Sequence, residues 1–172
     1  SGRGNAQRAL PQHCLRVRAV ASELARRNGC SAGEEQLLGD AALVHHYPPE
    51  LLGPDTIAST LAIMQRHCRV EAVQLDASSR RRHLDNLLKL LRAFHSASLQ
   101  NRGDALPGIL TVANYHVERI EAPRRPGEED PREAAIDALR RKAAEGLVTS
   151  AAFRTLQNFP RPHQSDLAQA VS

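Results

Sequence analysis

The feature that most constrains the fold is an apolar stretch that ends abruptly, residues 38–49 (LGDAALVHHYPP). At helical spacing Leu38, Ala41 and His45 share one face, and the two prolines at the end of the stretch stop a helix at once. The pattern therefore predicts a helix that carries the imidazole of His45 into the protein interior. A buried polar ring needs a hydrogen-bonding partner or another ligand, so the question becomes which other residues meet it.

The composition favours helices over strands. The chain has 172 residues, of which 41% are hydrophobic but only 3% aromatic, and it has no Trp. Leu, Ala, Val and Ile must therefore form the core, and no segment alternates apolar and polar residues as a strand does. We predict an all-α fold, a compact bundle of about six to seven helices. The length suits a single domain over residues 1–172, with its core at about 12–159 and an irregular tail at 160–172.

Apolar periodicity and capping signals give the helix boundaries. Ser31 followed by Glu34 has the spacing of a capping box, which marks the start of the helix that ends in the histidine pair. Asp130 before Pro131 marks a later helix start in the same way. The expected helices are 11–28, 31–46, 56–75, 80–98 and 106–121, then a sixth from Asp130 and a short last one from Thr149.

The charge distribution argues against nucleic acid as a partner. The formal net charge is +4, from 23 basic and 19 acidic residues. The basic clusters at 80–82, 124–125 and 140–142 have no aromatic residues between them on which bases would stack. We expect these clusters to be solvated charges.

Cysteine usage and hydropathy predict a cytoplasmic protein. Cys14, Cys30 and Cys68 are odd in number and lack the C-x-x-C spacing of a zinc or redox motif, so they are expected to be reduced thiols. No stretch has the pattern of a signal peptide, and no apolar run approaches the roughly 20 residues that a membrane span needs. We therefore expect no membrane partner.

Histidines recur on apolar helix faces. If these helices pack together, their imidazoles form one polar cluster, and imidazole clusters suit a divalent transition metal. The alternative is that each ring is a hydrogen-bonded interior group without a metal. The predicted metal-ligand set is His13, His45, His46, His67 and His95.

The order of these histidines, with the segments 63–75 (IMQRHCRVEAVQL) and 106–116 (LPGILTVANYH), resembles the HD superfamily of metal-dependent phosphohydrolases. More narrowly it is similar to the HD-GYP branch, whose active members hydrolyse the bacterial second messenger cyclic di-GMP. The likeness covers residues 12–159. It implies an HD-type helical bundle in which His13, His45 and His67 match histidine ligands of the family, and His95 matches one place of a later paired-histidine motif.

Four elements depart from the family pattern. His46 stands where the family has the aspartate of its His-Asp doublet, and Asn114 stands where it has a closing aspartate ligand. The lysine that follows the doublet is missing, and the glycine-tyrosine-proline loop is reduced to residues 97–104. Neutral imidazoles and an amide offer little negative charge to hold two divalent cations.

Two functions follow from this reading. The first is a degenerate, non-catalytic HD-GYP-like domain that acts as a signalling or interaction module, with another signalling protein or a flanking domain as its partner. The second is a hydrolase that uses one transition metal in a histidine-rich site. The sequence assigns no catalytic residue in either case.

A cyclic dinucleotide bound without hydrolysis is a further expectation from the resemblance. Arginines near the implied mouth of the site can pair with phosphate, and Asn114 lies beside it. The alternative is that each arginine is simply an exposed cation. The expected ligand-binding residues are Asn114, Arg92, Arg102 and Arg119.

Overall fold

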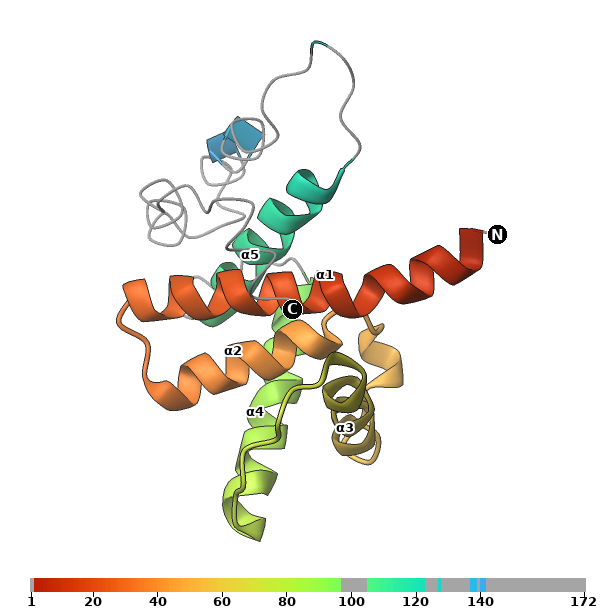
Figure 1. Ribbon diagram of the computed structural model, residues 1–172. Coiled ribbons are helices and arrows are strands. Elements are labelled where there is room, and N and C mark those ends of the chain that lie inside the picture. The colour runs from red at the N-terminus through yellow and green to blue at the C-terminus, as the bar shows by residue number, and fades with distance from the viewer. Residues whose placement is uncertain (1, 97–104, 123–126, 128–136, 139, 142–172) are drawn as a thin grey trace.

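The computed structural model is all-helical over the residues that it describes, which are 2–96, 105–122, 127, 137–138 and 140–141. Five α-helices and one short 3-10 helix make up its regular elements, and this part of the chain contains no strand (Figure 1). The predicted all-α class is therefore confirmed. The elements are α1 (Gly2–Arg27), α2 (Ala32–Val44), η1 (Pro49–Leu51), α3 (Ile57–Cys68), α4 (Ala77–Ser96) and α5 (Ala105–Glu121).

Helix α2 lies at the centre of the bundle. It runs beside α1 and also contacts α3, α4 and α5, while α1 packs against α5 on its other side (Figure 1). Every residue of α2 from 38 to 44 is buried. Gly39 leaves room for the Arg18 side chain of α1, because a Cβ there would lie 3.3 Å from Nε of Arg18. The apolar stretch seen in the sequence is thus the central core helix.

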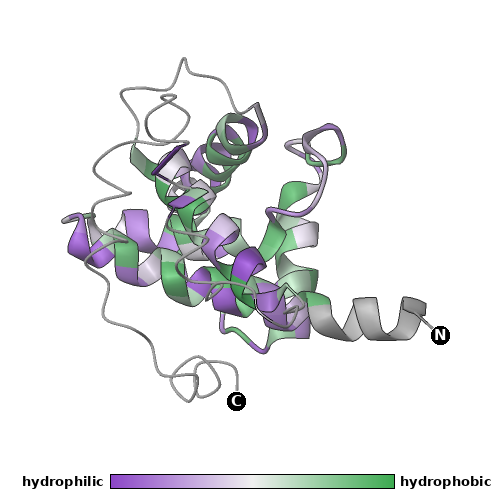
Figure 2. Cartoon of the chain, turned by 90° about the horizontal axis from the view of Figure 1, so that it is seen from above, coloured by the Kyte–Doolittle hydropathy of each residue, from purple (hydrophilic) through white to green (hydrophobic). Residues whose placement is uncertain are grey.

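The core is built from aliphatic side chains. Hydrophobic and hydrophilic residues share each helix in Figure 2, as expected where one face of a helix packs inward. Leu24, Leu38, Leu43, Leu87 and Ile109 are fully buried. Burying a Leu or Ile side chain contributes about 1.5–3 kcal/mol, so these residues supply much of the driving force for folding.

The start and end of α2 follow local signals. The Ser31 hydroxyl accepts a hydrogen bond from the backbone N–H of Glu34, whose carboxylate accepts one from the backbone N–H of Ser31. This confirms the predicted capping box. The helix ends at Val44, with His45 as its C-cap residue, two residues earlier than the sequence suggested.

The expectation of a helix over 56–75 is wrong. Helix α3 ends at Cys68, because Arg69 adopts a left-handed conformation with φ of 56°. The backbone N–H of Val70 then donates to the carbonyl of Gln65 at 2.9 Å, which closes the helix end as in a Schellman motif. Residues 70–76 have no regular structure, and Leu75, which the helical pattern had included, is 41% exposed.

Two other boundaries also differ from expectation. Helix α1 begins at Gly2 and includes Pro11, which the sequence had placed at a helix start. Helix α4 begins at Ala77 because the Asp76 carboxylate accepts a hydrogen bond from the backbone N–H of Ser79 at 2.8 Å.

The expected sixth and seventh helices, from Asp130 and from Thr149, lie largely outside the described residues. Those described from the sixth, 137–138 and 140–141, are helical. None of the helices in the described segments is long and apolar enough to span a membrane.

Candidate functional site

Side chains from three helices meet where α2 ends. His13 of α1 and His45 at the end of α2 both face Asn114 of α5, and each imidazole Nε2 lies 3.1 Å from Oδ1 of that asparagine. The two imidazole centroids are 5.4 Å apart. The predicted convergence of these two histidines and Asn114 is therefore present, although they are separated by up to 101 positions in the sequence.

The local sequence explains why His45 points inward. It follows the fully buried Leu43 and Val44, and its own side chain remains only 4% exposed. Its Nδ1 lies 2.6 Å from the carbonyl oxygen of Ala42, a carbonyl in the last turn of α2. This contact ties the imidazole to the helix end and fixes which of its nitrogens faces Asn114.

The contacts of Nδ1 in His13 and in His45 show which nitrogen of each ring carries a proton. Nδ1 of His45 faces a carbonyl oxygen, and Nδ1 of His13 lies 3.0 Å from a carboxylate oxygen of Glu121. An oxygen at these positions must receive an N–H, so Nδ1 carries the proton in each neutral ring and Nε2 presents a lone pair. The two Nε2 lone pairs thus converge on the Asn114 side-chain amide.

The Asn114 side-chain amide can donate a hydrogen bond to each of these two Nε2 atoms. If the Asn114 amide is turned so that its NH₂ faces the histidines, its two N–H bonds donate to Nε2 of His13 and to Nε2 of His45. Such a turn exchanges the oxygen and nitrogen positions of the side chain, which have nearly the same shape. The exposed carboxylate of Glu118, now 3.3 Å from Nδ2 of Asn114, is free to rotate into the solvent. We infer that the amide bridges the Nε2 atoms of the two imidazoles.

Burial disfavours a positive charge on His45 and on His46. Desolvation lowers the pKa of His45 from 6.5 to about 4, and the neighbouring His13 and His46 rings oppose a positive charge there as well. Desolvation likewise lowers the pKa of His46, with His13 acting in the same direction. At neutral pH both imidazoles are therefore neutral, with a lone pair available for a hydrogen bond or a metal.

A second grouping lies on the other side of His45. Nδ1 of His46 is 3.6 Å from Sγ of Cys14, while Nε2 of His46 is buried without a hydrogen-bond partner in the described structure. One ligand atom from each of Cys14, His45 and His46 lies within 4.8 Å of the others. Burial raises the pKa of the Cys14 thiol to about 12, so it is protonated unless a metal displaces its proton.

Negative charge is scarce around both groupings. Among the described residues, the carboxylates that hydrogen-bond to the cluster are Glu118 and Glu121. Glu121 is also engaged by the Arg16 guanidinium at 3.1 Å. Two divalent cations close together need bridging carboxylates, so this set does not fit a bimetal centre. Imidazole and thiol do fit one zinc-like or other transition-metal ion.

The remaining predicted ligands occupy different places. His67 is on the exposed side of α3, and its role as a ligand stays a prediction. His95 is half-buried on α4, 5.1 Å from the Phe94 ring, which in turn lies 5.8 Å from His45. Nε2 of His95 is buried and has no hydrogen-bond partner in the described structure. Its role as a ligand stays a prediction.

The predicted arginines are solvent cations where they are described. Arg92 on α4 and Arg119 on α5 are both exposed. Arg102 lies outside the described residues. A role for any of them in binding phosphate stays a prediction.

Sequence reasoning missed three participants. Cys14 is buried in the core, but no pattern in the sequence indicated that its Sγ lies 3.6 Å from Nδ1 of His46. Glu121 was assigned only as the end of a helix. Asp40 was counted as part of the apolar stretch, yet its carboxylate is buried and lies 2.7 Å from Nε2 of His83.

Comparisons with protein families, curated proteins and solved structures found no match to this chain. The resemblance to HD domains therefore rests on the residues of this sequence, and the functional argument rests on the geometry above.

Proposed function

We propose that this chain is a non-catalytic HD-GYP-like domain, a cytoplasmic signalling or interaction module in bacterial second-messenger regulation. The proposal includes an HD-type bundle of about six to seven helices in one domain. The observation that carries it is the Asn114 amide, which stands 3.1 Å from Nε2 of both His13 and His45, where the family has a carboxylate ligand.

The chemistry of that position explains the loss of catalysis. Metal-assisted phosphodiester hydrolysis needs anionic ligands that hold the cations and a metal-bound water whose pKa falls toward neutrality. An amide that donates to both imidazoles occupies their lone pairs and brings no charge. With His46 in place of the doublet aspartate, the two positions lose two negative charges together. The cluster then serves as a hydrogen-bonded part of the interior, which keeps the helices in register while the surface binds the partner.

Restoring the two carboxylates tests this proposal directly. In the double variant His46→Asp/Asn114→Asp, we expect stoichiometric Mn²⁺ binding by calorimetry, whereas the natural chain binds none tightly. Asn86→Asp is the control for added negative charge, because Asn86 is exposed on α4 and its substitution places one of the two added charges away from the cluster. A folded double variant that binds no more Mn²⁺ than the control would refute the HD-type arrangement.

The non-catalytic claim has its own test. Hydrolysis of bis(p-nitrophenyl) phosphate and of cyclic di-GMP is measured with the natural chain in added Mn²⁺, Ni²⁺ or Zn²⁺. We expect no turnover above the metal alone. Turnover that disappears in His45→Ala would overturn the claim. Calorimetric titration with cyclic di-GMP, repeated with Arg92→Ala and Arg119→Ala, then asks whether the domain binds the messenger without cleaving it.

One observation favours a second candidate, a hydrolase with one transition-metal ion. Cys14, His45 and His46 offer three ligand atoms within 4.8 Å of one another, and a bound metal would activate a water as nucleophile. Metal analysis of protein purified without chelator tests it, with about one zinc or nickel per chain expected. Loss of the metal in His46→Ala but not in His67→Ala would identify the cluster that binds it. Metal-free natural protein would remove this candidate.

A further inference from the structure

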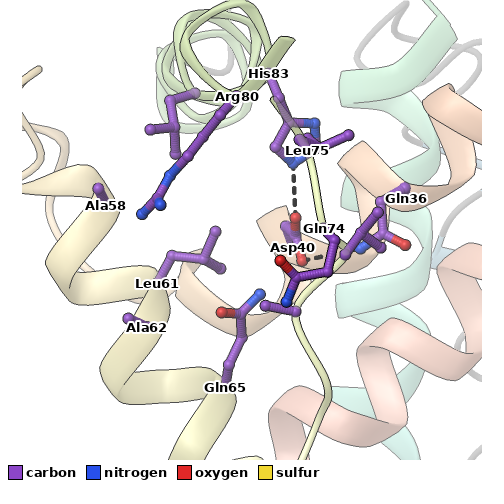
Figure 3. Close-up of a pocket in the computed structure, with 13 residues that line it drawn as sticks. Gln36, Asp40, Ala58, Leu61, Ala62, Gln65, Gln74, Leu75, Arg80 and His83 are labelled. Atoms are coloured by element: carbon purple, nitrogen blue, oxygen red, sulfur yellow. Dashed lines mark hydrogen bonds and ion pairs between the residues drawn. The ribbon is translucent and has the colours of Figure 1, made fainter. Parts of the chain in front are cut away.

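A second polar centre lies on the far side of α2 from His45, in a cavity bounded by α2, α3, α4 and the irregular segment 70–76. The cavity has a volume of about 200 Å³. On one wall the buried carboxylate of Asp40 lies 2.7 Å from Nε2 of His83 and accepts a hydrogen bond from the Gln36 amide at 3.3 Å (Figure 3). The Asp40 charge is therefore compensated by neighbours from its own helix and from α4.

The Gln65 amide on α3 is the least explained group in this cavity. The residue is only 8% exposed, and its side chain points into the space between the helices (Figure 3). It forms no side-chain hydrogen bond within the described part of the chain. Its amide atoms are open to the cavity rather than fully enclosed, so they are available to a ligand that enters it.

The Arg80 guanidinium places a positive charge at this cavity. Arg80 starts from the first turns of α4 and reaches over the cavity toward Ala58 and Leu61 of α3 (Figure 3). It has no ion-pair partner among the residues that the structure describes. The Gln74 amide, from the segment 70–76, faces the same space. The Arg80 cation and the amides of Gln65 and Gln74 thus face a space that Ala58, Leu61 and Ala62 of α3 line with apolar groups, opposite the Asp40–His83 pair.

We propose that this cavity binds a small organic carboxylate. A guanidinium matches a carboxylate through paired N–H···O bonds, the amides of Gln65 and Gln74 match a second polar group, and the wall of Ala58, Leu61 and Ala62 accepts a short alkyl chain. The volume is below the roughly 300–1,000 Å³ typical of larger ligands, which excludes a nucleotide and fits a short hydroxy acid, dicarboxylate or amino acid. Phosphate is disfavoured because it has no alkyl chain to contact the apolar wall of Ala58, Leu61 and Ala62.

A panel of small anions tests the proposal. Thermal unfolding of the natural chain is measured with acetate, lactate, succinate, glycine, L-glutamine and inorganic phosphate, each against sodium chloride of equal ionic strength. We expect a concentration-dependent rise in melting temperature with at least one carboxylate, and calorimetry then gives its affinity. Equal melting temperatures throughout the panel, or a rise with phosphate alone, would overturn the proposal.

Two variants connect binding to the cavity. Arg80→Gln is expected to lose affinity roughly tenfold or more, because it removes a charge-assisted pair. Arg81→Gln is its matched control, since Arg81 is exposed on the same helix and does not line the cavity. Gln65→Leu is expected to fold as the natural chain does, because no side-chain hydrogen bond of Gln65 within the described residues is lost, yet to lose binding as well. Equal affinity in Arg80→Gln and Arg81→Gln would contradict the assigned site.

Discussion

The neutral state of His45 makes a quantitative prediction about pH and stability. The folded protein lowers the pKa of His45 to about 4, against 6.5 for a solvated histidine, and the cause is burial. Between these two pH values the unfolded chain binds a proton that the folded chain does not. The contribution of this residue to the free energy of unfolding is therefore fully present above pH 6.5 and is lost as the pH falls toward 4.

The size of the loss follows from the shift. A pKa difference of this kind corresponds to about 3 kcal/mol when protonation is complete, and about 2 kcal/mol is already lost on going from pH 7.5 to pH 5. For a chain of this length 1 kcal/mol changes the melting temperature by about 2–4 °C, so we expect a decrease of about 4–8 °C. His46, whose pKa burial also lowers, adds to the effect in the same direction.

Urea unfolding of chelator-treated protein at pH 5, 6, 7 and 8 is the appropriate measurement. His45→Gln keeps a polar side chain but cannot take up the proton, so the fall in stability below pH 6.5 should become shallower. His67→Gln is the control, because His67 is exposed and its substitution should leave the pH profile unchanged. A natural chain equally stable at pH 5 and pH 8, or a His45→Gln profile as steep as that of the natural chain, would show that the ring is solvated and would refute the reasoning.

Three further predictions concern the core, the start of α2 and the thiols. Leu38→Ala should lower the free energy of unfolding by about 2–5 kcal/mol, because it leaves a cavity at a fully buried site, whereas Leu51→Ala, at a 64% exposed site, should change it by less than about 0.5 kcal/mol in urea titrations. Ser31→Ala should cost about 1 kcal/mol in the same assay through loss of the capping box, and no loss would mean that α2 does not depend on its cap. In thiol labelling of the native protein Cys30 should react first, because Cys14 and Cys68 are buried, and equal rates for all three would contradict the packing.

Local signals in the sequence predicted the helices where such signals exist. The capping box at Ser31 and the apolar periodicity of α5 gave boundaries within two residues of the structure. The end of α3 was missed because it depends on a left-handed Arg69, where neither glycine nor proline marks the stop. Leu75 continued the helical period by coincidence. A periodic pattern cannot show that the backbone has already left the helix.

The site was predictable only in part, for a related reason. Periodicity placed His13 and His45 on inward faces, and inward faces of packed helices meet near the axis of a bundle. Asn114 was included because the resemblance to the HD family implies a ligand at that position. Periodicity does not give the position along their axes at which two helices touch. The pairing of Asp40 with His83, which are 43 positions apart, could therefore not be predicted from the pattern. Asp40 lies within an apolar run, where a carboxylate is expected to disrupt packing unless a partner from another helix compensates it.

The contacts of Asp40 with His83 and of His45 with Asn114 help to fix the position of α2 in the bundle. A helical segment that is buried on all sides, as residues 38–44 of α2 are, has no amphipathic face to fix its rotation, and apolar contacts tolerate small slips along the axis. Asp40 and His45 remove that freedom, because one pairs with α4 and the other with α5, from positions five residues apart on a rigid helix. Buried polar contacts of this kind are satisfied in one register only, since any slip leaves them unpaired at a cost. Helix α2 is therefore a shared wall between the carboxylate cavity and the histidine cluster, and a ligand that repositions Asp40 acts on the same element that holds His45 against Asn114.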